Sequence, residues 1–302
     1  MVKKRQVACL LYLIMLLSTR NVFKDGSIMS KPLVSICIPA YNSARFIART
    51  INSALNQTYE NIEVVVVDDK SSDDTVEVVR AIEDTRVRLI CNEENLGMTG
   101  NWNRCINEAL GEYIKLIPAD DVVYDTCVEK SVAILEKNTD VSLVIVGTDL
   151  INNEDKIIGA YAHWPKEGIF DGKKIAKKSV MLNNFFGNPV CALFRKEDFV
   201  KSGGFDEDIP YILDFDLWLS LSSFGKVAVI KEKLSGFRVR KDSNTGKLTG
   251  KGSRDYTAEH VRLLDKHIAK KSFKMNLFER RISIIWRAMR NYIIAFYIRI
   301  KS

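Results

Sequence analysis

The sequence has few histidines and no clustered cysteines, which argues against several kinds of site. Its 302 residues include six cysteines and three histidines, with no C-x-x-C pair and no cysteine–histidine cluster. That spacing disfavours both a zinc site and a disulfide framework. We therefore expect reduced thiols, as in a cytoplasmic protein. The histidines match no motif, so we expect surface or packing roles for His163, His260 and His267.

Glycine is absent from the turn where a dinucleotide-binding fold needs it. The first expected strand, Val34–Ile38, is followed by Pro39-Ala40-Tyr41-Asn42-Ser43. A G-x-G-x-x-G turn belongs there, because only glycine lets the backbone approach a pyrophosphate so closely. The chain also has no G-x-x-x-x-G-K-[ST] phosphate loop. A nucleotide would therefore have to be held by other groups.

The apolar run near the N-terminus is too short to span a bilayer as a helix. This run, Val7–Leu17, follows a basic stretch at residues 3–5 and resembles the charged and apolar parts of a signal peptide. We expect residues 1–32 to be an N-terminal extension that acts as a weak membrane-surface anchor. Alternatively, Met29, just before the first strand, is the native start.

The charge of the chain is unevenly distributed. With 46% hydrophobic and 27% charged residues, the chain can bury a sizeable core. The net charge is +7, yet residues 254–302 carry 12 Lys and Arg against 4 Asp and Glu, which leaves about −1 for the rest. We therefore expect the tail, residues 253–302, to face an anionic partner, either a membrane or a nucleic acid.

Short β-branched runs alternate with helical stretches from Leu33 to Val146. This alternation predicts right-handed crossovers and a mostly parallel sheet, in which ligands bind beyond the carboxyl ends of the strands. The expected strands are 34–38, 62–67, 87–91, 113–117 and 141–146, and the expected helices are 44–55, one ending near residue 82, 102–110 and 125–137.

The pattern from residue 147 to 252 is mixed, with no internal repeat. The expected elements are a hairpin at 150–161, a loop rich in Asn and Gly at 183–188, a strand at 190–194, a helix at 214–223, strands at 227–230 and 234–239, and a polar loop at 241–252. Within this loop, residues 242–246 are expected to order as a lid over the donor.

Polar side chains directly follow four of the expected strands. They are Tyr41 and Asn42, Asp68 and Asp69, Asn95, and Asp120 and Asp121. Two adjacent carboxylates after a buried strand are costly without a partner. A Mg²⁺ or Mn²⁺ ion on a diphosphate would neutralise Asp120 and Asp121, because such ions prefer carboxylate and phosphate oxygens. Alternatively, the pair caps the helix that begins near Asp125.

Four segments together resemble the family 2 glycosyltransferases. They are residues 34–42 (VSICIPAYN), 62–75 (IEVVVVDDKSSDDT), 95–97 (NLG) and 111–121 (GEYIKLIPADD). The resemblance implies the α/β GT-A fold, a Rossmann-like, mostly parallel sheet flanked by helices. It also implies a donor-binding half at residues 33–146 and an acceptor-binding half at 147–252.

The resemblance further implies roles for individual residues. Tyr41 would stack on the nucleobase and Asp69 would accept a hydrogen bond from it. Asp120 would lie near the ribose, and Asp121 would hold the Mn²⁺ or Mg²⁺ ion on the diphosphate. The remaining donor-binding residues that the resemblance implies are Pro39, Asn42 and Asn95.

Residues 213–218 (LDFDLW) resemble the family's Glu-Asp pair with its following aromatic residue and Leu-Trp. Asp214 would be the general base, with an apolar setting raising its pKa. Asp216 is the second candidate, and the competing role for Asp214 is a helix cap.

The chain departs from the family pattern at three positions. Pro118 replaces an aspartate, Leu213 replaces the glutamate, and Arg240 replaces a histidine. Arg238 or Arg240 would contact diphosphate oxygens instead.

The last expected helix, residues 277–300, is basic and amphipathic. Its apolar face carries Ile282, Ile285, Trp286, Met289, Ile293, Phe296, Tyr297 and Ile300, with arginines opposite. This pattern favours a helix at a membrane surface, peripheral on the cytoplasmic face. The alternative is a helix packed on the catalytic domain or in a dimer.

The function expected from the resemblance is an inverting glycosyltransferase in cell-surface polysaccharide synthesis. It would move a sugar from a UDP or dTDP donor to a glycan or lipid-linked saccharide. The alternatives are a nucleotidyltransferase and a non-catalytic module that binds sugars or nucleotides. A nucleic-acid partner is not expected, because the body lacks a recognition module.

Overall fold

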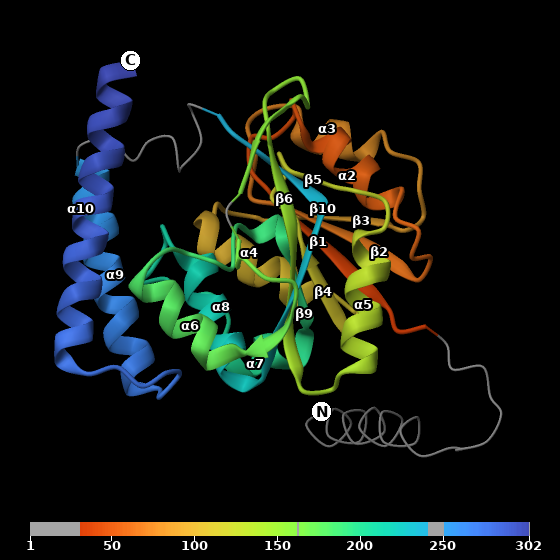
Figure 1. Cartoon of the computed structure of the whole chain (residues 1–302). Helices are drawn as coiled ribbons and strands as arrows, with labels where there is room; N and C mark the ends of the chain where they lie inside the picture. Colours follow the sequence, from red (N-terminus) through yellow and green to blue (C-terminus); the bar gives the residue numbers. More distant parts are fainter. Residues whose placement is uncertain (1–30, 162, 241–250, 302) are drawn as a thin grey trace, which may run out of the picture. The chain divides into compact units, whose positions relative to one another are not determined.

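The computed structural model describes residues 31–161, 163–240 and 251–301, with the side chains of 251–255 and 291–301 left out. Its sheet has the strand order β3-β2-β1-β4-β9-β6-β10-β5, with β7 beside β6 and β8 beside β10 (Figure 1). The strands are β1 Val34–Ala40, β2 Ile62–Asp68, β3 Val87–Cys91, β4 Tyr113–Leu116, β5 Val122–Val123, β6 Val141–Ile151, β7 Ile157–Ala160, β8 Gly168–Asp171, β9 Ala192–Arg195 and β10 Lys226–Arg238.

Helices connect these strands. Figure 1 shows α2, α3 and α5 on one side of the sheet and α4, α6 and α8 on the other. The helices are α2 Ile47–Leu55, α3 Thr75–Arg80, α4 Gly97–Glu108, α5 Cys127–Lys137, α6 Gly172–Met181, the 3₁₀ turn η1 Pro189–Cys191, α7 Lys196–Ser202, α8 Leu213–Phe224, α9 Lys251–Ala269 and α10 Leu277–Lys301.

The N-terminal part of the sheet is parallel, as predicted. Strand β1 pairs in parallel with β2 on one side and with β4 on the other, and all its residues are buried. Helices cover both faces of such strands, so apolar residues run continuously along them instead of alternating. The chain passes from β1 to β2 and β3 on one side and then returns through α4 to β4 on the other side of β1. This reversal of direction places a crevice beyond the carboxyl ends of β1 and β4.

The second half of the sheet is mixed. Strand β9 is antiparallel to both β4 and β6, whereas β10 runs parallel to β6. The sequence suggested two strands here, but β10 is continuous and carries register shifts near Lys231 and Glu232. At this irregularity β10 passes close to Gly147 of β6, where a Cβ atom would lie 2.6 Å from the carbonyl oxygens of Lys231 and Glu232. Only glycine allows that approach.

The predicted hairpin is present as the antiparallel pair β6 and β7. Two helices begin well away from the expected residues, because loops between strands have their own hydrogen bonds. The helix expected from residue 44 starts at Ile47, after a turn in which Phe46 N donates to Ser43 O. Helix α4 starts earlier than expected, at Gly97, whose positive φ of 71° forms the preceding turn. The structure also contains α6 and α7, which the sequence pattern did not suggest.

The two C-terminal helices pack on the rest of the domain. Helix α10 lies along α9 and contacts α6, and α9 contacts α8 (Figure 1). The described residues from Pro32 onward form one compact unit. No helix in the described ranges is long and apolar enough to cross a membrane.

Three expectations concern residues outside the described ranges. They are the N-terminal anchor with the alternative start at Met29, the lid expected within residues 241–250, and the apolar side chains at the end of α10, Ile293, Phe296, Tyr297 and Ile300.

Candidate functional site

The loop after β1 is tied to the loop after β2 through Asn42. The Asn42 backbone has a φ of 47°, a left-handed conformation that asparagine adopts more readily than most residues. Its N–H donates to Ser71 Oγ at 2.9 Å, and its Oδ1 accepts from Ser72 N at 2.8 Å. The neighbouring Pro39 is buried within β1, whereas Tyr41 is 53% exposed. Asn42 thus shapes the loop that presents the Tyr41 ring at the surface.

Asp69, at the end of β2, is a buried carboxylate that organises the next loop. Its Oδ1 accepts from Leu96 N at 2.8 Å and from Asn92 Nδ2 at 2.6 Å. Asn95 donates through Nδ2 to the Asp69 carbonyl oxygen and accepts from Gly97 N. Both ends of the Asn95 amide therefore hold the turn in this structure, so Asn95 supports Asp69. The preceding Asp68 accepts hydrogen bonds from Ser71 and belongs to the loop itself.

Asp120 and Asp121 follow β4 and lie on a wall formed with the end of β10. Asp121 is fully buried, and its Oδ1 accepts from Arg238 N at 2.8 Å. Among the described residues its Oδ2 has no hydrogen-bond partner. Burial, reinforced by the charge of Asp120, raises the pKa of Asp121 well above its ordinary value. Burial also raises the pKa of Asp120, although Arg240 opposes this shift.

The two arginines of this wall have different surroundings. The Arg238 side chain is fully buried; it donates to the carbonyl oxygens of Asp120 and Asn152, and pairs with Asp155. Arg240 is partly exposed and its Nε lies 3.0 Å from Asp120 Oδ2. Arg238 therefore stabilises the backbone around Asp120 from the buried side and is not itself exposed. Of the two arginines expected to contact a diphosphate, Arg240 is the one that borders the open side.

The carboxylates of Asp120 and Asp121 supply only part of the ligands that a divalent cation needs. The unpartnered Asp121 Oδ2 and the nearby Asp120 carboxylate are hard oxygen ligands of the kind that Mg²⁺ and Mn²⁺ prefer. Among the described residues, no group of three His, Cys, Asp or Glu side chains is arranged to hold a metal. An ion at this wall would therefore need phosphate oxygens or water to complete its coordination.

Asp214 lies in the first turn of α8, in a pocket of about 140 Å³. Burial raises its pKa to about 6, although Phe215 N donates to its Oδ1 at 2.7 Å. The pocket is also lined by Tyr161, Asn188 and Phe237. Since Phe237 and Arg238 are consecutive in β10, this strand connects the Asp214 pocket to the Asp120 wall. A carboxyl group with such a pKa is suited to accept a proton near neutral pH.

Asp216, the second candidate for a base, is engaged in packing. Its Oδ1 lies 2.9 Å from His267 Nε2 and its Oδ2 lies 2.7 Å from Lys266 Nζ, both on α9. The other two histidines are also hydrogen-bonded within the fold, and burial lowers the pKa of His163 to about 4 and that of His260 to about 3. Asp216 therefore joins α8 to α9, and Asp214 is the carboxylate left facing a pocket.

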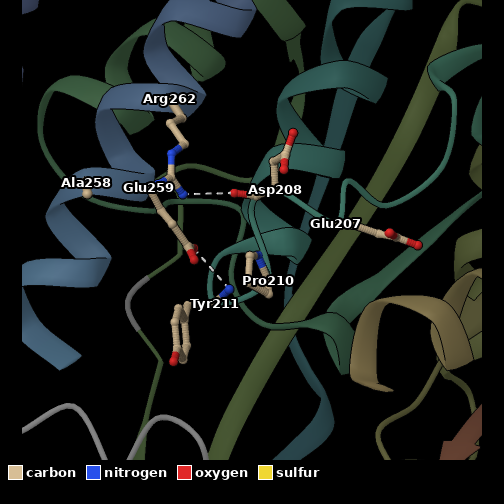
Figure 2. A pocket seen from close by; sticks show the side chains of 7 residues that line it. All are labelled: Glu207, Asp208, Pro210, Tyr211, Ala258, Glu259 and Arg262. Atoms are coloured by element: carbon tan, nitrogen blue, oxygen red, sulfur yellow. Dashed lines mark hydrogen bonds between the residues drawn. The ribbon is translucent and has the colours of Figure 1, made fainter. Parts of the chain in front are cut away.

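A second hollow, of about 560 Å³, lies just before α8 (Figure 2). At its edge Glu259 of α9 accepts from the backbone N–H groups of Tyr211 at 3.0 Å and Ile212 at 3.2 Å. Arg262, one turn further along α9, donates to the Asp208 carbonyl oxygen. Helix α9 thereby holds the backbone that leads into α8 and sets the position of Asp214.

Sequence reasoning missed part of the Asp214 pocket. Tyr256 and His260 from α9 and Arg287 from α10 all line it. They belong to the basic tail, where the sequence analysis looked for a membrane-binding element and not for site residues. No local motif surrounds these residues. Only the packing of α9 and α10 against α6 and α8 brings them to Asp214.

Comparison with known proteins places these features in context. The family model for glycosyl transferase family 2 matches residues 35–203. An uncharacterized glycosyltransferase of Haemophilus influenzae is 30% identical over 218 residues, covering 69% of this chain and 66% of the relative. A hyaluronan synthase of Pasteurella multocida is 32% identical over 205 residues, covering 67% and 20%. A chondroitin synthase of Escherichia coli is 32% identical over 228 residues, covering 75% and 32%. The chain thus spans from a fifth to about two thirds of these relatives.

The fold is also that of a solved structure. The crystal structure of Staphylococcus aureus TarS residues 1–349 in complex with UDP-GlcNAc superposes with a TM-score of 0.66 at 15% identity. The match covers 84% of this chain and 71% of that one. The expected GT-A fold is therefore confirmed.

Proposed function

The chain belongs to glycosyl transferase family 2, and from that premise we propose that it transfers a sugar, with inversion, from a nucleoside diphosphate to a saccharide acceptor. The observation that carries the proposal is Asp214, a carboxylate with a pKa near 6 in a small pocket lined by both polar and apolar side chains. Strand β10 links this pocket to the acidic wall at Asp120 and Asp121. A base on one side and a leaving-group site on the other are what a single displacement requires.

The donor would lie across the ends of β1, β2 and β4. The exposed ring of Tyr41 is available to stack on a base, a contact that contributes about 1–3 kcal/mol. Asp69 would accept a hydrogen bond from the base, and Asp120 would lie beside the ribose. The TarS structure contains UDP-GlcNAc, which supports a UDP sugar as donor, with dTDP as the alternative base.

Asp121, with Asp120 beside it, would hold a Mn²⁺ or Mg²⁺ ion on the diphosphate. When bound, the ion would supply positive charge for the negative charge that develops on the leaving diphosphate. A cation would also favour the ionised form of Asp121, whose pKa is raised by burial. Arg240, the partly exposed cation at the same wall, would add a second positive charge to the diphosphate site.

In the transfer step Asp214 would take the proton from the acceptor hydroxyl. The acceptor oxygen forms a bond to the anomeric carbon while the bond from that carbon to the diphosphate oxygen breaks on the opposite face. The proton is left on Asp214, and the nucleoside diphosphate leaves with the electron pair. One displacement from the opposite face inverts the anomeric configuration.

The acceptor we propose is a glycan or a lipid-linked saccharide, in cell-surface polysaccharide synthesis. The similarity to a hyaluronan synthase and a chondroitin synthase, which are named for making polysaccharides, supports this choice. A lipid-linked acceptor would place the protein at the cytoplasmic face of the membrane.

A donor screen tests the proposed function. We expect the purified chain, supplied with Mn²⁺ or Mg²⁺, to release nucleoside diphosphate from one or a few UDP or dTDP sugars, as followed by mass spectrometry. In the presence of an acceptor, NMR of the product should show the anomeric configuration opposite to that of the donor. Nucleotide binding without turnover of any donor would instead indicate a non-catalytic binding module, and a retained configuration would contradict the inverting mechanism.

The α10 helix is the membrane contact we propose. Its exposed residues Phe278, Ile282, Ile285, Trp286 and Met289 fall on one face at helical spacing. The opposite face, with Ser283 and Arg287, is the one buried against the domain. Apart from the Trp286 indole N–H, which donates to Leu182 O, this apolar face is largely exposed among the described residues. Together with the basic tail it suits an anionic lipid surface.

We expect Ile285→Glu to weaken binding to phosphatidylglycerol-containing vesicles by about 10- to 100-fold, because a buried isoleucine contributes about 1.5–3 kcal/mol. Ala288→Glu is the matched control, since it adds the same charge at an exposed position outside the apolar face. Vesicle flotation measures both variants. Equal binding by the two variants would contradict the proposal. Light scattering that shows a dimer dissociated by Ile285→Glu would assign the face to a second copy of the chain.

A further inference from the structure

Arg287 is a buried cation without a counterion in the described part of the chain. Its side chain is 7% exposed, and its Nη2 atom has no hydrogen-bond partner there. The guanidinium group lies 5.9 Å from the centre of the Phe215 ring, beside Asp214 in the chain. Taking a charge out of water is costly unless a partner replaces the water. Arg287 is therefore placed where a partner of opposite charge would be strongly held.

The position of Arg287 is set by contacts on its own helix. Ser283, one turn earlier, donates to Val180 O at 2.7 Å and lies 3.0 Å from His260 Nε2. Trp286 Nε1 donates to Leu182 O at 2.8 Å. These bonds anchor α10 to α6 and α9 and direct the Arg287 side chain into the Asp214 pocket. The arrangement is built by tertiary contacts and is not a solvated charge on a helix surface.

A second unpartnered group lies in the same pocket. Asn188 is 6% exposed, and neither its Nδ2 nor its Oδ1 has a hydrogen-bond partner among the described residues. Buried amides are almost always hydrogen-bonded in native proteins. A guanidinium and an amide that both lack partners, in one pocket of about 140 Å³, indicate a ligand that supplies oxygen acceptors.

We propose that Arg287 and Asn188 bind an anionic group, a carboxylate or a phosphate, carried by the saccharide acceptor. This inference rests on the proposed function, because it takes Asp214 as the base for the acceptor hydroxyl. Arg287 shares the pocket of that base, whereas the donor diphosphate is assigned to the wall at Asp120, Asp121 and Arg240. The acceptor is thus a charged saccharide, and Arg287 selects it over a neutral one. A planar guanidinium can bind either anion through two parallel hydrogen bonds.

The test uses Arg287→Gln in the full chain. Three acceptors of equal length are compared: one ending in a uronic acid, one bearing a phosphate, and a neutral analogue. We expect the wild type to prefer one charged acceptor, and Arg287→Gln to lower kcat/KM for it by about 10- to 100-fold, the effect of one charge-assisted hydrogen bond. The kcat/KM for the neutral acceptor and the KM for the donor should change less than threefold.

The matched control is Arg281→Gln, which removes the same charge from an exposed position on the same helix. It should leave the acceptor preference unchanged. The Tm of Arg287→Gln without ligand should equal or exceed that of the wild type, because a buried unpaired charge is removed. A large fall in Tm, or equal losses for charged and neutral acceptors, would overturn the proposal and assign Arg287 a structural role.

Two further outcomes separate this inference from others. A rise in donor KM or a weaker affinity for UDP in Arg287→Gln would assign the arginine to the donor diphosphate. If the wild type transfers sugar to no acceptor, the proposed function fails, and calorimetry then tests the subsite alone with the same three oligosaccharides. Binding of a charged oligosaccharide that is lost in Arg287→Gln supports the subsite, and the absence of such a difference overturns it.

Discussion

Asp214→Asn is expected to lower kcat by about 10²- to 10⁴-fold, the usual contribution of a positioned general base. Asparagine keeps the size of the side chain and an oxygen that can accept from Phe215 N, but it cannot take a proton from the acceptor hydroxyl. The KM for the donor should change little, because Asp214 lies in the acceptor pocket. Steady-state kinetics with the donor found in the screen measures both constants.

The pH dependence of the wild type follows from the same carboxyl group. Burial raises the pKa of Asp214 to about 6, and only the deprotonated form can act as a base. The rate should therefore rise as the pH increases through about 6 and level off above it. Of the other titratable groups that line the pocket, burial raises the pKa of Tyr161 and Tyr256 further above its ordinary value, and it lowers the pKa of His260 to about 3. Asp214→Asn should lose this rise.

The stability of Asp214→Asn distinguishes catalysis from folding. A carboxyl group whose pKa is higher in the folded than in the unfolded state destabilises the fold progressively as the pH rises through that folded pKa. Removing it should therefore leave the Tm at pH 8 unchanged or raised. Asp216→Asn is the contrasting variant, because it weakens the contacts to Lys266 and His267 and should lower the Tm. If Asp216→Asn is stable but inactive and Asp214→Asn is active, then Asp216 would be the general base and Asp214 the structural residue.

Asp121→Asn is expected to lower kcat by about 10²- to 10³-fold, comparable to the loss of one electrostatic contact to the developing charge. Asparagine can still accept from Arg238 N, so the fold should be preserved. EDTA should abolish wild-type turnover, and added Mn²⁺ should restore it. In the variant, the Mn²⁺ concentration needed for half-maximal activity should rise.

Asp155→Asn provides the control for Asp121. Asp155 pairs with the Arg238 guanidinium, whereas Asp121 accepts from the Arg238 backbone N–H, and the amide analogue of Asp155 would still accept a hydrogen bond. This variant should retain both its activity and its response to Mn²⁺. Full activity in EDTA, together with unchanged kinetics in Asp121→Asn, would contradict a metal role at this wall. If the wild type is active in EDTA but Asp121→Asn is inactive, the positive charge that neutralises the diphosphate would come from Arg240 and not from a metal ion.

Much of the fold was predictable because its signals are local. A run such as Ile62–Val67, in which every residue except Glu63 is apolar, shows a buried strand directly, since helices cover both of its faces. Helix boundaries were predicted less well, because side chains in the loops determine them. Asn42 and Asp69 hydrogen-bond to backbone groups of neighbouring loops, and no periodicity indicates such contacts.

The amphipathic pattern of α10 predicted which residues share a face, but not which face packs on the domain. The apolar residues that the pattern grouped on one face, Ile282, Ile285, Trp286 and Met289, are exposed together in the structure. The pattern alone could not decide which face packs on the domain, because either face can do so. In the structure the face with Ser283 and Arg287 is buried, whereas Ile285 and Met289 are exposed.

The sequence by itself determined the alternation of strands and helices as far as residue 146, the family resemblance, and the polar residues at the strand ends, because each depends on residues close together in the chain. The tertiary structure decided which of these residues face open space. Arg238 and Asp121 are 117 positions apart, and only the folded sheet shows that Arg238 backs the acidic wall while Arg240 borders its open side. Likewise, only helix packing brings Arg287 to Asp214, because long-range contacts leave no local pattern.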